Sequence, residues 1–256
     1  MKNIITLMTD FGLRDHYAGV MKGVILGINP DAVIVDITHE IRKYHIYEAA
    51  FKLRGCYNYF PKGTIHVAVV DPGVGGPRRP LAAEAGGYYF VGPDNGIFSP
   101  VLESVDKSAV VEITRTEFML ENVSRTFHGR DIFAPAAAHL SNGVSILDLG
   151  RTLPQPVSID VPTPSVKGDE IRGVVLYADS FGNLVTNVPG NMVVPGMAVY
   201  AGQYRIGPVK ATYGDVEKGN LLAIIGSSGL LEISVNQGSA REVLNKERVF
   251  VRIVRE

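Results

Sequence analysis

The sequence predicts two domains: an α/β domain with a largely parallel central sheet over residues 1–165, and a small all-β, barrel-like domain over residues 166–256. Three observations lead to this fold class. Apolar runs of strand length alternate with helix-length patterns in the first part of the chain, which favours a parallel α/β layer. Four prolines within residues 154–164 then indicate an extended linker. Beyond it only strand signals remain, separated by turn residues.

The first domain is predicted from short apolar runs that glycine and proline clusters separate. One predicted helix carries Gly19, Gly23 and Gly27 at four-residue spacing. Glycine costs roughly 1 kcal/mol in a helix interior, so this stripe predicts a close backbone approach, within the chain or against another copy of it. The predicted strands are residues 4–9, 32–38, 64–70, 81–85, 88–91 and 110–114, and the predicted helices are residues 15–28, 44–59 and 131–140.

The second domain shows β-branched and apolar runs of strand length, with glycine, asparagine and proline between them. Its predicted strands are residues 171–177, 197–200, 220–225, 230–235 and 248–254.

Composition narrows the classes of function. The 256 residues carry a formal net charge of −1, so bulk electrostatics predict no nucleic-acid binding and no attraction to a membrane surface. A single cysteine rules out an intrachain disulfide and favours a reducing, cytoplasmic setting. The first apolar run reaches Asp10 too soon for a secretory signal, and no run approaches the ~18 residues of a membrane span.

Charged side chains follow predicted strands at three places in the first domain. Asp10 ends the first strand, Asp71 ends the strand over residues 64–70, and His128 precedes the alanine-rich helix. The carboxyl ends of parallel strands and the N-termini of the following helices meet at one edge of a sheet, so these groups are expected to share a cleft. Each also has a structural explanation: Asp15 and Asp131 can cap helices, and a lone histidine is often a hydrogen-bonded core residue.

In the second domain, Phe181 and Asn183 lie in one predicted loop. An aromatic face beside an amide suits a nucleobase, because the amide can donate to and accept from a purine edge. A turn in which Phe181 covers the barrel core explains the same residues. The GSSG of residues 226–229 lacks the lysine of a phosphate-binding P-loop and opens no helix, so that motif is rejected.

Five motifs occur in order along nearly the whole chain. They are TDFG-x-x-D-x-Y (residues 9–17), VVDPGVG-x-x-RR (69–79), FHGRDIFAPAAAHL (127–140), FGNLVTN (181–187) and GSSGLLEI (226–233). Together they resemble the S-adenosylmethionine (SAM) hydroxide adenosyltransferases, also called SAM hydrolases, which are related to the SAM-dependent fluorinase and chlorinase.

The resemblance implies a homotrimer with active sites between the first domain of one subunit and the second domain of a neighbour. It also implies a water-handling set that falls here on Asp71, Arg78 and His128; motif spacing favours Arg78, and Arg79 is expected to anchor the loop. The halogenases of this group resemble the chain less, because they have a tyrosine at the position of Asp71, a different residue at the position of His128, and a longer insertion after the strand over residues 64–70. The resemblance therefore favours water over halide.

In the first domain the resemblance implies five substrate-binding residues. Asp10 accepts hydrogen bonds from the ribose hydroxyls, and Asp15 faces the methionine ammonium. Tyr44 lies on the methionyl side, and Phe127 packs against the purine. Gly129 completes this group.

In the second domain the implied substrate contacts come from the last two motifs and their flanks. These residues are expected to contact four parts of the substrate: the methionine ammonium with the sulfonium, the face of the purine, the adenine edge and the methionine carboxylate. The residues are Asp179, Phe181, Asn183, Ser227, Ser228, Glu232 and Val235.

The implied chemistry suits these residues. The sulfonium leaves as a neutral thioether, so what is needed is a better nucleophile than water, whose pKa is about 15.7. Arg78 can stabilise developing negative charge, His128 can accept or relay a proton, and Asp71 can orient the water; whether Asp71 or His128 takes the proton stays open. The histidines have no metal-ligand spacing, and neither a metal nor a cofactor is expected.

Three alternatives stay open at this point. One is a halide-using synthase of 5′-halogenated adenosine. Another is a metal-dependent nucleotide phosphatase with Asp10, Asp71 and Asp94 around a magnesium ion, although no paired aspartates support it. The third is a binding module for adenosine or SAM that does no chemistry.

Overall fold

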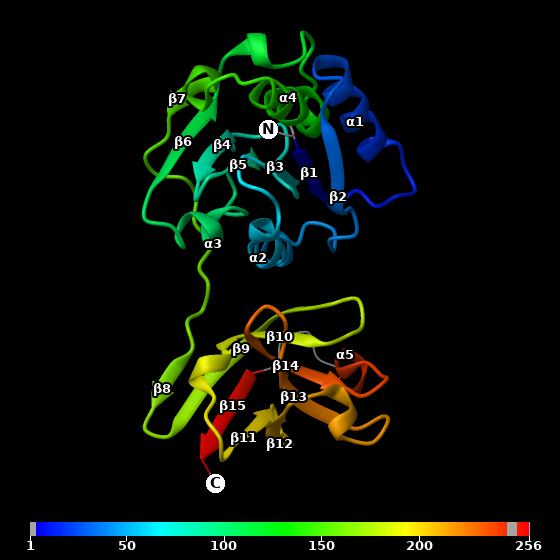
Figure 1. Ribbon diagram of the computed structural model, residues 1–256, viewed down its shortest axis with the longest axis vertical. Helices are drawn as coiled ribbons and strands as arrows, with labels where there is room; N and C mark the ends of the chain where they lie inside the picture. The colour runs from blue at the N-terminus through cyan, green and yellow to red at the C-terminus, as the bar shows by residue number, and fades with distance from the viewer. Residues whose placement is uncertain (1–3, 245–249, 256) are drawn as a thin grey trace. The chain divides into compact units, whose positions relative to one another are not determined.

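The computed structural model describes residues 4–244 and 250–255. The chain forms two compact units, Met1–Ile159 and Asp160–Glu256, and Figure 1 shows the elements of each. The division falls six residues before the boundary expected at residue 165. Each unit is described by itself.

The first unit is built on a seven-stranded sheet with strand order β2-β1-β3-β5-β4-β6-β7. The pairings of β1 with β2, β1 with β3 and β3 with β5 are parallel, and the remaining three are antiparallel. The predicted α/β class is confirmed, and the sheet is mixed because a hairpin places β4 beside β5. The strands are β1 Ile4–Thr9, β2 Val33–Thr38, β3 Ile65–Val69, β4 Pro80–Ala85, β5 Tyr88–Pro93, β6 Ser108–Ile113 and β7 Gly150–Thr152.

Helices cover both faces of this sheet (Figure 1). Alternation along a strand sends neighbouring side chains to opposite faces, so Leu7 of β1 packs with the core on one side and Met8 with the core on the other. Helices α1 Tyr17–Ile28 and α4 Ala134–Ser141 belong to the first core, and α2 Ile46–Cys56 and α3 Ser99–Leu102 to the second. Within residues 4–244 and 250–255, no helix has the length and apolar character needed to cross a membrane.

The glycine stripe of α1 does not pack within the chain. Gly19, Gly23 and Gly27 are exposed, and apart from the helix's own backbone no described atom lies within 4 Å of a Cβ built at any of them. The expectation of close packing inside the chain is therefore wrong, and packing against another copy stays a prediction.

The second unit is a closed barrel of seven strands, β9 to β15, in the order β10-β14-β13-β12-β11-β15-β9, with β9 pairing again with β10 and β8 extending one edge. The predicted all-β class is confirmed, but a short helix, α5 Ala240–Leu244, also occurs. Residues 248 and 249 of the last predicted strand lie outside the described residues. The strands are β8 Ser165–Lys167, β9 Glu170–Ala178, β10 Leu184–Pro189, β11 Met197–Ala201, β12 Tyr204–Lys210, β13 Leu221–Ile225, β14 Leu230–Val235 and β15 Phe250–Arg255.

The proline-rich segment 154–159 is held on the first unit. The Asp94 carboxylate is buried and accepts hydrogen bonds from Arg79 Nε at 2.8 Å and from the Val157 N–H at 2.7 Å. Arg79 also donates to the Gln155 carbonyl at 3.1 Å. The segment has no regular secondary structure, as predicted for a linker, yet these bonds fix its course, and the expected anchoring role of Arg79 agrees with them.

Candidate active site

The candidate site lies where two parallel strands and one helical turn end. Asp10 follows β1, and Asp71 lies two residues after β3. His128 precedes a π-helical turn, Gly129–Phe133, that leads into α4. Ligands bind outside the carboxyl ends of parallel strands in open α/β sheets, and π turns are frequent at functional sites.

Asp71, Arg78 and His128 are in direct contact. Arg78 Nε donates to both Asp71 oxygens at 3.0 and 2.9 Å, and Arg78 Nη2 lies 2.5 Å from Asp71 Oδ2. The same Nη2 lies 2.6 Å from His128 Nδ1. The side chains of Asp71 and Arg78 are only 6% and 10% exposed. Charge-assisted bonds of this fork-like type fix geometry as well as charge, so the three groups form one rigid unit, which we call the Asp–Arg–His set.

The contact with Arg78 determines the tautomer of His128. A guanidinium can only donate, so Nδ1 accepts, and the neutral ring then carries its hydrogen on Nε2. Burial, together with the charge of Arg78, lowers the pKa of His128 below its usual value, against the opposing effects of Asp71 and Asp131. The imidazole is therefore neutral near pH 7, and its one N–H serves the hydrogen bond to the Ser124 backbone.

A close backbone approach brings Arg78 to His128. Gly75 has φ +73°, and a Cβ there would lie 2.1 Å from the carbonyl oxygen of Arg125. Only glycine fits such a position. The loop that carries Arg78 therefore lies directly on the segment that leads to His128.

The buried Asp131 fixes that segment. Its carboxylate accepts from the Ser124 N–H at 2.8 Å, from Ser124 Oγ at 2.6 Å and from Arg130 Nε at 2.6 Å. Its side chain is fully buried. Asp131 thus ties the loop before His128 to the π turn after it, and the described contacts give it no place in the cavity.

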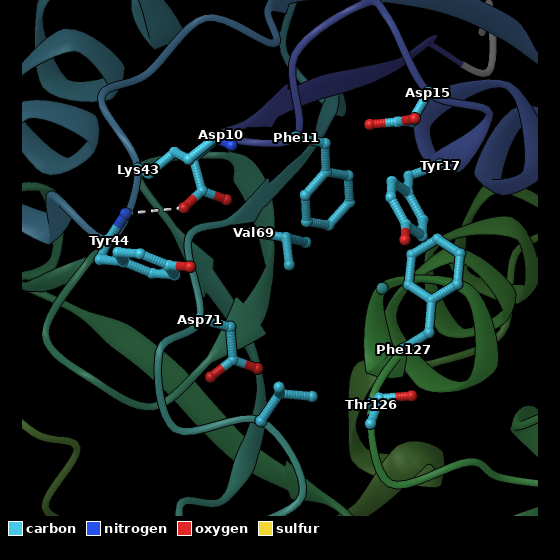
Figure 2. A pocket seen from close by; sticks show the side chains of 12 residues that line it. Asp10, Phe11, Asp15, Tyr17, Lys43, Tyr44, Val69, Asp71, Thr126 and Phe127 are labelled. Carbon is cyan, nitrogen blue, oxygen red and sulfur yellow. Dashed lines mark hydrogen bonds between the residues drawn. The ribbon is translucent and has the colours of Figure 1, made fainter.

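A cavity of about 370 Å³ opens beside the Asp–Arg–His set. Figure 2 shows the side chains that line it. The structure brings the five expected binding residues of this domain together with Asp71, whereas Arg78 and His128 contact Asp71 or one another and are not part of the lining. Expected members of the lining are Asp10, Asp15, Tyr44, Asp71, Phe127 and Gly129, and members that the sequence reasoning missed are Phe11, Tyr17, Lys43, Val69, Val74 and Thr126.

Some of the missed residues had a signal in the sequence. Phe11 and Tyr17 lie inside the TDFG-x-x-D-x-Y motif, whose aspartates alone were given roles. Val69 lies two residues before Asp71 on the strand that predicted the site. Lys43 had no such signal, because its place in the cavity depends on the unusual backbone conformation of the residue that follows it, Tyr44.

That residue, Tyr44, has an unusual backbone. Its φ of +67° is rare for a bulky side chain, and its N–H donates to Asp10 Oδ2 at 2.8 Å. Strain of this kind persists only where the surroundings impose it. Here Arg42 bonds both Glu48 and His45, which fixes the chain on either side. Burial raises the pKa of Asp10, and the Tyr44 bond opposes that shift.

In the second unit, the Asp179 carboxylate organises the predicted loop. Asp179 Oδ1 accepts from the N–H groups of Phe181 and Asn183, both at 2.9 Å, and Oδ2 accepts from Asn183 Nδ2 at 3.0 Å. Phe181 is 77% exposed, so the alternative in which it covers the barrel core is wrong. The bonds assign Asp179 a positioning role, and its expected contact with the substrate's ammonium stays a prediction.

Glu232 is buried on β14 and forms a polar cluster with the buried Ser234 and the exposed Tyr213. It accepts from Tyr213 Oη at 3.0 Å and from Ser234 Oγ at 3.1 Å. Burial, followed by the charge of Glu232, raises the pKa of Tyr213 to about 12. Tyr213 had no sequence signal, because it joins Glu232 only through the barrel. Ser227 and Ser228 are exposed on the β13–β14 turn, and Val235 is buried at the end of β14.

A metal site finds little support among the residues that the structure describes. No group of three or more histidine, cysteine, aspartate or glutamate side chains there could hold an ion. In the arrangement considered for a phosphatase, Asp94 is instead engaged by Arg79 and the Val157 N–H. Asp71 is engaged by Arg78.

Comparison with known proteins places the chain in a family. The SAM hydroxide adenosyltransferase N-terminal domain matches residues 5–150, and the SAM hydroxide adenosyltransferase C-terminal domain matches residues 173–248. The chain belongs to the SAM hydroxide adenosyltransferase family. These two matches extend over both structural units, as the five motifs predicted.

Relatives of known name agree with this. The (R)-S-adenosyl-L-methionine hydrolase of Thermus thermophilus is 38% identical over 98% of this chain and 99% of its own length. That of Methanocaldococcus jannaschii is 37% identical over 95% and 92%. A fluorinase of Actinopolyspora mzabensis is 25% identical over 98% and 97%. A crystal structure of an uncharacterized conserved protein from Thermotoga maritima aligns with a TM-score of 0.92 at 38% identity, over 98% of this chain and all of that one.

Proposed function

We propose that this chain hydrolyses S-adenosyl-L-methionine to adenosine and L-methionine. The observation that carries the proposal is the contact of Asp71, Arg78 and His128 beside a cavity that Asp71 lines. The named hydrolase relatives support it.

The reaction is a displacement at the ribose 5′ carbon. A bond forms between the water oxygen and this carbon while the carbon–sulfur bond breaks. The bonding pair goes to sulfur, which leaves as the neutral thioether of methionine, and one proton is released to solvent. In-line placement of the nucleophile behind the carbon–sulfur bond supplies much of the rate.

The Asp–Arg–His set favours hydroxide as the nucleophile. The Arg78 cation stabilises an anion, and a preorganised, water-poor site makes such a group most effective. His128 cannot take a proton on Nδ1 without losing its bond to Arg78. We therefore assign His128 and Asp71 the role of holding Arg78 in place from its two sides.

The charge of the cavity matches a cationic substrate. Three carboxylates line it, those of Asp10, Asp15 and Asp71, against the single cation of Lys43. Asp71 is neutralised by Arg78, so Asp10 and Asp15 supply net negative potential where the ammonium and sulfonium would lie. Asp10 is also placed to accept from the ribose hydroxyls.

Several finer features form part of the proposal. We propose the (R) epimer at sulfur as the preferred substrate, by extension from the hydrolase relatives. We also propose a homotrimer in the cytoplasm that uses neither a metal nor a cofactor and binds no nucleic acid. The exposure of Tyr44 (70%) and Phe181 (77%) supports a second copy as the cover of both sets of expected contacts.

One experiment tests the reaction directly. The purified protein is incubated with each sulfonium epimer of SAM, with and without a chelator and with chloride or fluoride, and the products are separated by chromatography. We expect adenosine and methionine in equal amounts, faster from the (R) epimer and unchanged by chelator or halide. A 5′-halogenated adenosine would favour the synthase, chelator-sensitive turnover the phosphatase, and stoichiometric binding without product the binding module.

A further inference from the structure

Three aromatic side chains form one wall of the cavity. The ring centroids of Phe11 and Tyr17 lie 5.8 Å apart, those of Phe11 and Phe127 5.8 Å, and those of Tyr17 and Phe127 5.2 Å. All three residues line the cavity, and in Figure 2 they gather on the side away from Tyr44 and Asp10. Tyr17 is 40% exposed, so core burial does not account for it. We call this group the aromatic wall.

Gly129 allows the aromatic wall to close. A Cβ at this position would lie 3.2 Å from Met21 Sδ, 3.3 Å from Phe127 Cε2 and 3.5 Å from Phe11 Cζ. Contacts of 3.2 and 3.3 Å are tighter than a side chain normally tolerates, so a larger residue would displace Met21 or the Phe127 ring. The glycine expected to bind substrate thus acts on the position of the Phe127 ring.

The Phe127 ring already borders one cation. The guanidinium of Arg130 lies over it, 5.3 Å from the ring centroid. Arg130 lines a neighbouring hollow of about 360 Å³ and does not line the cavity beside Asp71. Phe127 lines both hollows, and its contact with Arg130 shows that a positive group fits against its ring.

The displacement reaction predicts where the substrate's own cation lies. An in-line attack needs the nucleophile and the leaving group on opposite sides of the 5′ carbon. The nucleophile belongs beside Asp71, so the sulfonium belongs across the cavity, toward Tyr17 and Asp15. Figure 2 shows the aromatic wall in that direction. A cation within about 6 Å of an aromatic centroid is attracted by the ring quadrupole.

We propose that Phe11, Tyr17 and Phe127 bind the sulfonium cation and select a charged sulfonium over a neutral thioether of the same skeleton. This inference rests on the proposed function and deepens it, and it replaces the contact with the purine that was expected for Phe127. The attraction ends when the carbon–sulfur bond breaks, because sulfur then becomes neutral. The wall thus holds the substrate more tightly than the methionine it becomes, which favours release of product.

Binding measurements test the wall without relying on turnover. Calorimetry is done in an Asp71→Asn background, with SAM, with neutral S-adenosylhomocysteine and with adenosine as ligands. We expect Phe11→Leu, Tyr17→Leu and Phe127→Leu each to weaken SAM binding by about 3-fold to 30-fold, with less than a twofold change for the two neutral ligands. Tyr17→Phe keeps the ring and should keep the preference for SAM.

A matched control and two contrary outcomes complete the test. Phe118→Leu removes an aromatic ring that contacts His139 outside the cavity and should leave the affinity for all three ligands unchanged; thermal melts verify that every variant is folded. If the three leucine variants weakened the binding of SAM and of S-adenosylhomocysteine equally, or left the preference for SAM unchanged, the proposed role of the aromatic wall would be overturned. Selective SAM binding with no adenosine formed by the unsubstituted chain would overturn the hydrolase and leave the wall standing.

Discussion

Two consecutive arginines in this chain perform different tasks. Arg78 contacts Asp71 and His128 at the site, whereas Arg79 contacts Asp94 and the Gln155 carbonyl. Side chains of adjacent residues in extended backbone point to opposite sides, which lets one pair of residues serve the site and the linker at once.

The substitution Arg78→Lys should therefore differ sharply from Arg79→Lys. A lysine keeps the charge but cannot bridge Asp71 and His128 with a planar fork. We expect Arg78→Lys to lower kcat about 10²-fold to 10³-fold with little change in KM. Steady-state kinetics with SAM provide the measurement.

The control substitution Arg79→Lys should retain kcat and lower the thermal stability modestly, because only the linker contacts change. Similar kcat values for the two variants would contradict a special role for Arg78.

At this scale the sequence predicted the acids well and the loop residues poorly. Asp10 and Asp71 were found because strand ends converge by topology alone. Lys43 and Tyr213 were not, because their places depend on a left-handed Tyr44 and on barrel closure, and neither leaves a local pattern.

At the scale of elements, the loop of residues 71–79 is held by its approach to the segment before His128. Gly75 is the point of contact, because the Arg125 carbonyl occupies the space that a Cβ at this position would need. The contact between Arg78 and His128 therefore depends on a residue that does not line the cavity.

Gly75→Ala should disturb both stability and rate. The left-handed φ and the 2.1 Å overlap with Arg125 together should cost roughly 1–3 kcal/mol. Because the loop must move to relieve the overlap, kcat should fall as well. Urea unfolding and steady-state kinetics measure the two effects.

Gly143→Ala is the matched control, since Gly143 has φ +91° with no atom within 4 Å of a Cβ. It should cost about 1 kcal/mol from backbone strain alone and leave kcat unchanged. A loss of kcat in Gly143→Ala equal to that in Gly75→Ala would argue against the loop contact.

Elements were predictable where the apolar pattern was strong. β1, β3 and β14 read clearly as strands because burial makes them nearly continuous apolar runs. β12 contains Gly207 and Pro208, which weaken a strand signal, and the sequence reasoning missed it. The π turn before α4 was also missed, since an extra residue in a helical turn changes no composition.

At the scale of the whole molecule, folding buries an ionisable ring in the first unit. His66 on β3 is fully buried, with Nδ1 2.8 Å from Thr6 Oγ1 and aromatic rings of Tyr57, Phe60 and Phe90 around it. Burial lowers the pKa of His66 to about 4. The histidine is therefore neutral in the folded state throughout the range in which the unfolded chain gains a proton.

Acid should therefore destabilise the fold before the carboxylates titrate. As pH falls from about 6.5, the unfolded chain binds a proton at residue 66 that the folded chain refuses until about pH 4. The free energy of unfolding should fall by about 2–3 kcal/mol between pH 7 and pH 4.5 from this group. Urea unfolding followed by circular dichroism measures it.

The variant His66→Gln has no proton to gain and should show a correspondingly weaker pH dependence, even if it is less stable at pH 7. An identical slope in the two proteins would show that other groups cause the acid sensitivity.

The division into two units was predictable because a proline cluster separates two different patterns. Its exact place was not, because the bonds that hold residues 154–159 come from Arg79 and Asp94, far away in the sequence. The antiparallel pairings of β4 with β6 and of β6 with β7 were also hidden, since pairing order is a property of the assembled fold.

Those bonds also define how the chain can be dissected. In a fragment of the first unit that ended at residue 153, the buried Asp94 carboxylate would lose the Val157 N–H as a donor, and Arg79 would lose the Gln155 carbonyl as an acceptor. A fragment that ended at Ile159 would keep both hydrogen bonds. The proline-rich segment thus belongs to the first unit. A chimera that takes its barrel from a relative is best joined after this segment.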